Sequence, residues 1–325
     1  MTTFRMLGAV LVLGLFLSGC ASEEFTPTAV GDAATAATPG AVAYANADDP
    51  EAQISAMIDD ANLTLEGEGV QILMGEWVGN PDGGIAGGTV IAKDVGNKRL
   101  TADFVPFDGR RTWSGAAPAS DNVTYAIDQT GDAVPFFGGL TGAETDAAIE
   151  RGTASWEALN CSALPQFRNP DFGLDIGYVA AILSGGTVGS FNILADVQHA
   201  GWRDLNFAGG VLGVTFTFIF TGVSGPTDID GNGLADTAFR EIYYDPSWNW
   251  ADDGSSNIDV ETVAVHEIGH GLSQAHFGTV RIKNNGDVQA SPRAVMNALY
   301  NGPYRTLAGT DNGGHCSNWA NWPYG

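Results

Sequence analysis

Basic residues are scarce in this chain of 325 residues, with 14 Lys and Arg against 38 Asp and Glu and a formal net charge of −24. A protein that binds nucleic acid needs clustered cations to replace the counterions of the phosphates. The deficit therefore argues against a nucleic-acid partner. The acidic excess suits a protein that works in salt, where screening weakens self-repulsion, and it serves simple solubility equally well.

Long apolar runs are missing beyond the first 20 residues. Residues 6–17 are apolar, a stretch too short to span a bilayer comfortably and typical of the central region of a signal peptide. The following Leu-Ser-Gly-Cys20 resembles the bacterial lipobox, which implies a lipid on Cys20, attachment to a membrane and a place in the bacterial cell envelope, at the outer membrane or cell surface or released from it. An ordinary signal peptide with a chance cysteine is the alternative.

Cysteines number only three. If Cys20 carries a lipid, Cys161 and Cys316 are left as a possible pair, and export places them where disulfides persist. Two separate buried thiols are the alternative.

The chain divides by composition into four parts. Residues 1–19 are the expected lipoprotein signal peptide, and residues 20–48, rich in Ala, Thr, Gly and Pro, are an expected flexible tether. Residues 49–118 begin with a helix-start pattern and continue with strand-like segments, which predicts a small α+β unit. This unit could be a propeptide, a spacer or a binding module. Residues 119–325 form the expected catalytic domain.

Within that last part, strand and helix patterns alternate. A capping-box pattern at Thr141 and Glu144 predicts a helix, and a second helix is expected over 260–272, capped by Asn257 or Asp259. Alternating or apolar runs predict strands near 122–129, 190–198, 211–220 and 237–244.

The second helix carries the residues with the clearest chemistry. His266 and His270 are four apart, so both imidazoles lie on one helical face and can bind one ion. Glu267 follows the first histidine, where it can reach a metal-bound water without ligating the metal.

The segment His-Glu-Ile-Gly-His-Gly-Leu-Ser-Gln-Ala-His resembles the metzincin zinc peptidases, and among them the matrixin (matrix-metalloproteinase-like) family. The resemblance implies that His266, His270 and His276 are zinc ligands and that Glu267 is the general base. The glycine of the family pattern is Ser273 here, at a turn where a left-handed backbone would cost a serine about 1 kcal/mol.

A second family element supports the resemblance. Ala-Val-Met296-Asn-Ala-Leu-Tyr300 is similar to the Met-turn that lies beneath the zinc, and Tyr300 is a candidate for a pocket wall or for ordinary packing. The resemblance implies an α+β metzincin-like catalytic domain with a twisted, mostly parallel sheet. It also implies an edge strand near 211–216, along which a protein or peptide substrate binds in extended form. No cysteine-switch motif accompanies it.

A second ion site is expected in the segment between two strands. Oxygen ligands from Asp228, Asp230, Asn232, Leu234 and Asp236 follow the spacing of an EF-hand calcium loop. The twelfth position lacks the glutamate of that loop, and the flanks are strand-like. A plain Asx/Gly turn is the alternative.

These observations predict a zinc-dependent endopeptidase that hydrolyses proteins outside the cytoplasm by Glu-assisted attack of a zinc-bound water. The alternative function is a calcium-stabilised surface binding or adhesion lipoprotein on the same fold, with little or no catalysis.

Overall fold

The computed structural model describes residues 49–324 apart from 82–87, 92–99, 112, 114–119, 129, 131–133, 256 and 284–287. The predicted signal peptide, tether and lipidation site at Cys20 lie outside the described residues. None of the helices within the described ranges has the length and apolar character needed to cross a membrane.

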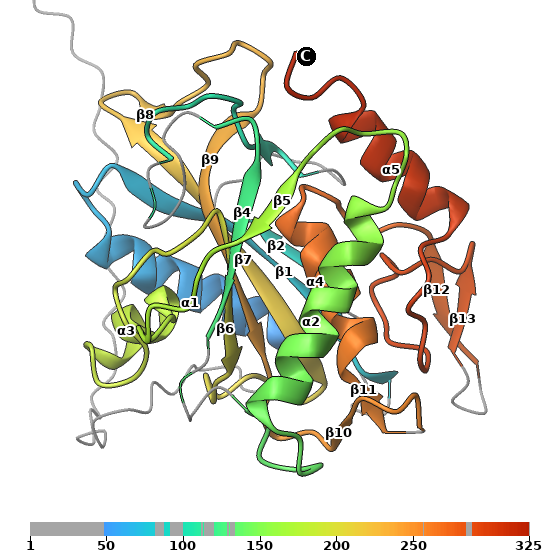
Figure 1. The fold of residues 1–325 in the computed structure, drawn as a ribbon. Helices are drawn as coiled ribbons and strands as arrows, with labels where there is room; N and C mark the ends of the chain where they lie inside the picture. Colours follow the sequence, from blue (N-terminus) through green and yellow to red (C-terminus); the bar gives the residue numbers. More distant parts are fainter. Residues whose placement is uncertain are drawn as a thin grey trace, which may run out of the picture. The chain divides into compact units, whose positions relative to one another are not determined.

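A mixed β-sheet forms the centre of the described chain (Figure 1). Its strands run in the order β2-β1-β7-β9-β6-β4-β5, with β3 paired to β9 and β8 paired to β7. Pairing is parallel from β9 through β6 and β4 to β5, and antiparallel where β7 pairs with β9 and with β1. The strands are β1 (Val70–Gly79), β2 (Gly88–Ile91), β3 (Ala102–Asp103), β4 (Val123–Ile127), β5 (Gln166–Arg168), β6 (Val197–Trp202), β7 (Val211–Gly222), β8 (Gly225–Pro226) and β9 (Ala235–Tyr244).

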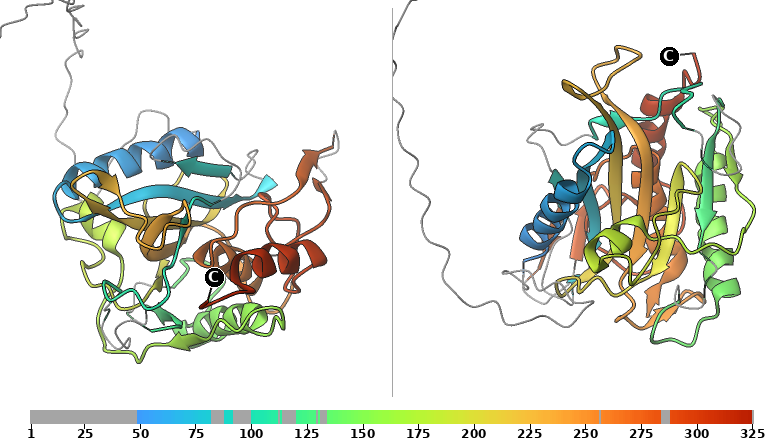
Figure 2. Two further views of the ribbon diagram at one scale, coloured as in Figure 1. Left: turned by 90° about the horizontal axis from the view of Figure 1, so that it is seen from above. Right: turned by 90° about the vertical axis from the view of Figure 1, so that its left-hand side faces the viewer.

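Helices cover both faces of this sheet, as Figure 2 shows for α1 on one side and α2 on the other. One apolar core lies between the sheet and the helices α1 and α3, and a second lies between the sheet and the helices α2 and α4. The helices are α1 (Pro50–Thr64), α2 (Gly142–Glu157), α3 (Tyr178–Ser184), α4 (Val260–Gly271) and α5 (Gly309–Trp319). Two small sheets pair β10 (Trp250–Ala251) with β11 (Ile258–Asp259) and β12 (Thr279–Ile282) with β13 (Val288–Ser291). The prediction of an α+β fold is confirmed.

The helices begin where their sequences predict. Asp49 accepts hydrogen bonds from the first turn of α1, and Thr141 and Glu144 form the reciprocal capping box of α2. Of the two residues expected to cap α4, Asp259 does so, accepting from the backbone N–H of Thr262 at 2.9 Å. These caps satisfy backbone donors that have no partner inside the helix.

The described residues of the segment 49–118 do not form the separate unit expected there. Strand β1 pairs with β7 along its length, from Val70 opposite Phe220 to Gly79 opposite Val211, and β3 pairs with β9. The segment therefore belongs to the same sheet as the rest. The predicted edge strand near 211–216 is also wrong, because this part of β7 pairs with β1 on one side and β9 on the other. Strand patterns reveal which residues are apolar but not which strand they pair with.

Cys161 and Cys316 form a disulfide, as predicted. The bond links the chain just after α2 to α5, so that the C-terminal helix is tied to the core of the domain. Because 155 positions separate the two cysteines, the crosslink removes a large loop-closure entropy from the unfolded chain.

His199 is fully buried on β6. Its Nδ1 lies 3.0 Å from the hydroxyl of Tyr244, and burial lowers the pKa of the imidazole to about 3. The ring is therefore neutral in the folded protein at all moderate pH values.

We predict that His199 contributes to acid sensitivity. The unfolded chain protonates this histidine below about pH 6.5, whereas the folded protein does not, so its stabilising contribution is present above pH 6.5 and declines towards pH 3. Urea unfolding at pH 7.5 and pH 4.5 should show that the wild type loses about 3 kcal/mol more than His199→Gln over this range. Loss of metal at low pH affects both proteins and cancels in the difference. Equal losses in the two proteins would contradict the prediction.

Candidate metal centre

Helix α4 presents two histidines on the face that it turns towards the sheet. His266 and His270 are buried, one turn apart. The helix is held from behind by α2, where the indole N–H of Trp156 donates to the carbonyl of Val265 at 2.8 Å. Gly152 of α2 allows this approach, because a β-carbon there would lie 3.1 Å from Ile268. The positions of both imidazoles thus follow from a rigid helix–helix contact.

The chain reverses after α4 at Ser273, which has a left-handed backbone with φ of 64°. Its hydroxyl accepts a hydrogen bond from Arg240 Nη1 at 2.9 Å and donates one to Asp103 Oδ1 at 3.0 Å. Arg240 also donates to the carbonyl of Gly271 at 2.9 Å. These hydrogen bonds compensate for the backbone strain that a glycine would avoid. The turn then delivers His276 back to the histidines of α4.

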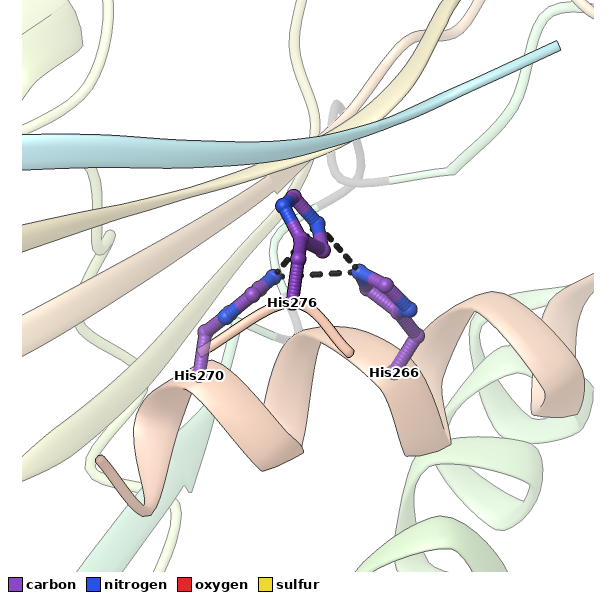
Figure 3. A group of neighbouring side chains, drawn as sticks. All are labelled: His266, His270 and His276. Atoms are coloured by element: carbon purple, nitrogen blue, oxygen red, sulfur yellow. Dashed lines mark hydrogen bonds between the residues drawn. The ribbon is translucent and has the colours of Figure 1, made fainter. Parts of the chain in front are cut away.

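The three histidines aim their Nε2 atoms at one point (Figure 3). The Nε2 atoms lie 3.0 Å apart for His266 and His270, and 3.2 Å apart for each of the pairs with His276. The structure therefore brings together all three residues that the sequence predicts as metal ligands.

The opposite ring nitrogens fix the protonation of these imidazoles. His266 Nδ1 lies 2.7 Å from the carbonyl of Val295, and His270 Nδ1 lies 2.8 Å from the carbonyl of Gln274. A carbonyl oxygen only accepts, so both Nδ1 atoms carry the proton and both Nε2 atoms present a bare lone pair. His276 Nδ1 faces the carboxylate of Glu76 at 3.4 Å, which favours the same tautomer.

The site fits a zinc ion. Four ligands placed tetrahedrally about 2.0–2.1 Å from zinc lie about 3.3 Å from one another, close to the observed separations of the Nε2 atoms. Burial lowers the pKa of His266 to about 4 and lowers those of His270 and His276 well below the usual value. The imidazoles are therefore neutral, the form in which histidine ligates a metal. Three converging lone pairs need a cation between them.

Glu267 is fully buried beside the histidines. Its Oε2 accepts a hydrogen bond from Thr215 Oγ1 of β7 at 2.6 Å, whereas its Oε1 has no hydrogen bond of standard geometry within the described ranges. Gly213 leaves room for this side chain, since a β-carbon there would lie 3.0 Å from Glu267. Burial raises the pKa of the carboxyl well above its usual value, a shift that strengthens it as a base.

Met296 lies directly beneath the helix, as the Met-turn prediction requires. Gly269 makes this possible, because a β-carbon there would lie only 2.3 Å from the Met296 sulfur. The turn itself is held by Asp311 of α5, which accepts hydrogen bonds from the backbone N–H groups of Val295 and Met296 at 3.0 and 3.1 Å. The carbonyl of Val295 in turn orients the ring of His266. Helix α5 therefore supports the metal site through Val295.

Strand β1 covers the centre, as the pale blue strand above the histidines in Figure 3. Glu76 and Val78 of this strand are buried over the site, and the backbone N–H of Val78 helps to lower the pKa of Glu267. Val78 also lines a pocket beside His266. Tyr300 forms another wall of this pocket, and its hydroxyl accepts from the backbone N–H of Asp259 at 3.0 Å.

The predicted calcium loop joins β8 to β9 and places three carboxylates together. Oxygen atoms of Asp228, Asp230 and Asp236 all lie within 4.8 Å of one another. Asn232 donates through its side-chain amide to Asp230 and accepts from the backbone N–H of Leu234 at 2.7 Å. Partial burial, together with the neighbouring carboxylates of Asp228 and Asp236, raises the pKa of Asp230.

The site also contains residues that the sequence motif did not reveal. Thr215, Asp311, Arg240 and Glu76 each lie far from the motif along the chain, and each acts on the site through its side chain. Of these four residues, only Asp311 can be noticed in the local sequence, because an acid in the first turn of a helix interacts favourably with the helix dipole.

We predict that the hydroxyl of Ser273 stabilises the fold, whereas its left-handed backbone destabilises it. Ser273→Ala keeps the left-handed strain and leaves Arg240 and Asp103 without a shared partner, so stability should fall by about 1–3 kcal/mol. Ser273→Gly loses the same hydrogen bonds but relieves about 1 kcal/mol of strain. Thermal unfolding and chelator competition for zinc should therefore rank wild type above Gly and Gly above Ala. The exposed Ser317→Ala is the control, and an Ala variant as stable as the Gly variant would refute this account.

We predict that calcium stabilises the fold through the loop of Asp228, Asp230 and Asp236. At about 100 times the dissociation constant a bound ion adds about 2.7 kcal/mol, which raises the melting temperature by about 5 °C. The comparison is calcium chloride against sodium chloride at equal ionic strength, with zinc held constant. Asp230→Asn should abolish the shift, and Asp60→Asn on α1 should retain it. An unchanged melting temperature in the wild type would exclude a structural calcium ion.

No protein-family model and no curated protein sequence matches this chain. The function is therefore inferred from the residues of the site and their geometry.

Proposed function

We propose that this chain is a zinc-dependent endopeptidase with a matrixin-like metzincin catalytic domain. The observation that carries the proposal is the convergence of three neutral imidazoles, with Nε2 atoms 3.0–3.2 Å apart, next to a buried glutamate. Three histidines with an open fourth position are typical of catalytic rather than structural zinc sites. The position of Met296 beneath α4 and the turn that brings His276 to the histidines of the helix support the matrixin-like assignment.

The chemistry follows from the side chains that surround the ion. His266, His270 and His276 would hold a zinc ion, which would polarise the scissile carbonyl and lower the pKa of water. Thr215 holds one oxygen of Glu267, which leaves Oε1 to accept the proton of the attacking water. The raised pKa of the carboxyl lets Glu267 retain this proton and then transfer it to the leaving amine.

An extended protein or peptide is the substrate class that fits these surroundings. The pocket beside His266 combines apolar walls from Val263 and Val295 with the ring of Tyr300, which suits one side chain of a peptide. Backbone hydrogen bonds to β7 would align the chain only where β1 no longer pairs with that strand.

The proposal places the enzyme outside the cytoplasm, in the bacterial cell envelope, anchored through a lipid on Cys20. The disulfide between Cys161 and Cys316 supports an oxidising compartment. A second candidate function, a calcium-stabilised binding or adhesion lipoprotein, is favoured by one observation: β1 buries Glu267 completely.

We predict that Glu267→Ala abolishes peptide cleavage and keeps the metal. Loss of a general base should lower the rate about 10²–10⁴-fold, while zinc content stays at one per chain. Because β1 covers the site, casein and a peptide library are tested with the intact protein and after limited proteolysis. The matched control is Glu261→Gln on the same helix, where the carboxylate pairs with Arg151 rather than with the site.

Two outcomes would contradict the proposal. Cleavage retained by Glu267→Ala would refute the role of the glutamate. Zinc bound at one per chain without cleavage by any form of the protein, including a form from which β1 has been displaced, would favour the binding function.

A further inference from the structure

Strand β1 has the geometry of a peptide bound in the cleft. It runs antiparallel to β7, and its end continues alongside the segment that follows Met296. There the backbone N–H of Gly79 donates to the carbonyl of Ala298 at 3.1 Å, and the N–H of Tyr300 donates to the carbonyl of Gly79 at 2.8 Å. The strand is therefore held by backbone hydrogen bonds on both sides, as an extended ligand added to a sheet would be.

The side chains of β1 point to the parts of the site that a substrate would use. Glu76 faces the ring of His276 at 3.4 Å, and Val78 lines the pocket beside His266. Between them, Trp77 turns to the opposite face and packs in the core that contains α1. The backbone N–H of Val78 acts on the carboxyl of Glu267, so the peptide unit joining Trp77 to Val78 lies next to the proposed base.

This arrangement closes the site to any other peptide. Glu267 and His270 have no exposed surface, and the part of β7 opposite the histidines has both of its backbone edges paired. A second chain has no free strand edge to join at this place.

The elements that cover the site, α1, β1 and β2, come first in the described chain, and the two strands lie at one edge of the sheet. Helix α1 and strands β1 and β2 are consecutive in sequence, and β2 and β1 are the last two strands on their side of β7. Their departure would leave β7 as an edge strand without breaking the order of the remaining strands.

We propose that helix α1 and strand β1 form an inhibitory segment in which β1 occupies the substrate position, so that the site opens only when β1 leaves β7. The inference rests on the proposed zinc peptidase function. Contact of Ile54, Met57 and Ile58 with the sheet keeps the segment in place, so opening requires both a cut in the chain and a weakened contact of β1.

The test uses the full chain, loaded with zinc, with the recognition sequence of a site-specific protease replacing residues 93–98. Val78→Asp is added to weaken β1, because a carboxylate in the apolar pocket disfavours docking. Acetohydroxamic acid, a small zinc-binding probe, reports access to the ion by calorimetry independently of turnover, and a fluorogenic peptide reports cleavage. Zinc content and near-ultraviolet circular dichroism confirm that each form is folded.

Cutting the Val78→Asp protein should raise its affinity for acetohydroxamic acid about 100-fold over the uncut wild type, as expected when the accessible form changes from rare to dominant. The cut wild type and the uncut variant should show smaller increases. If Val78→Asp does not fold, Val78→Gly removes the side chain from the pocket without adding a charge and is judged by the same criterion.

Equal affinity of the probe for uncut wild type and for the cut, weakened protein would overturn the inhibitory role, and it would leave the peptidase proposal standing. Increased binding of the probe without peptide cleavage would support the inhibitory role and contradict the peptidase function. The two proposals can therefore fail separately.

Discussion

Three imidazole nitrogens with their lone pairs directed at one point repel one another unless a cation lies between them, and much of the structure serves to maintain this arrangement. The carbonyls of Val295 and Gln274 hold the protons on the far side of two rings, and Glu76 faces the third. Burial keeps the rings neutral, so the ligands are ready without deprotonation. The helix contacts, the turn at Ser273 and the support from α5 all position these rings.

The sequence predicts the local parts of this site well. The spacing of His266 and His270 requires only helix geometry, and the caps of α2 and α4 depend on residues within one turn. The pairing of Cys161 with Cys316 followed from the small number of cysteines. Each of these predictions depends on short-range chemistry or on counting, for which the sequence is sufficient.

The parts that the sequence could not predict are those set by pairing over a long distance. The apolar pattern of β1 satisfies any sheet, so nothing local assigns it to β7 or places Glu76 over His276. Thr215 is an ordinary strand residue until α4 packs against it and brings Glu267 within 2.6 Å. A serine is acceptable at position 273, where the family pattern has a glycine, because the distant Arg240 donates a hydrogen bond to its hydroxyl.

The contact of Asp311 with the Met-turn has a consequence for the order of assembly during synthesis. The carboxylate that holds Val295 and Met296 belongs to one of the last helical turns of the chain, whereas the histidine that Val295 orients was translated 45 residues earlier than Asp311. A nascent chain therefore contains all three histidines before it contains the residue that steadies one of them. Docking of α5 and binding of a metal ion therefore favour one another, because both fix the orientation of His266.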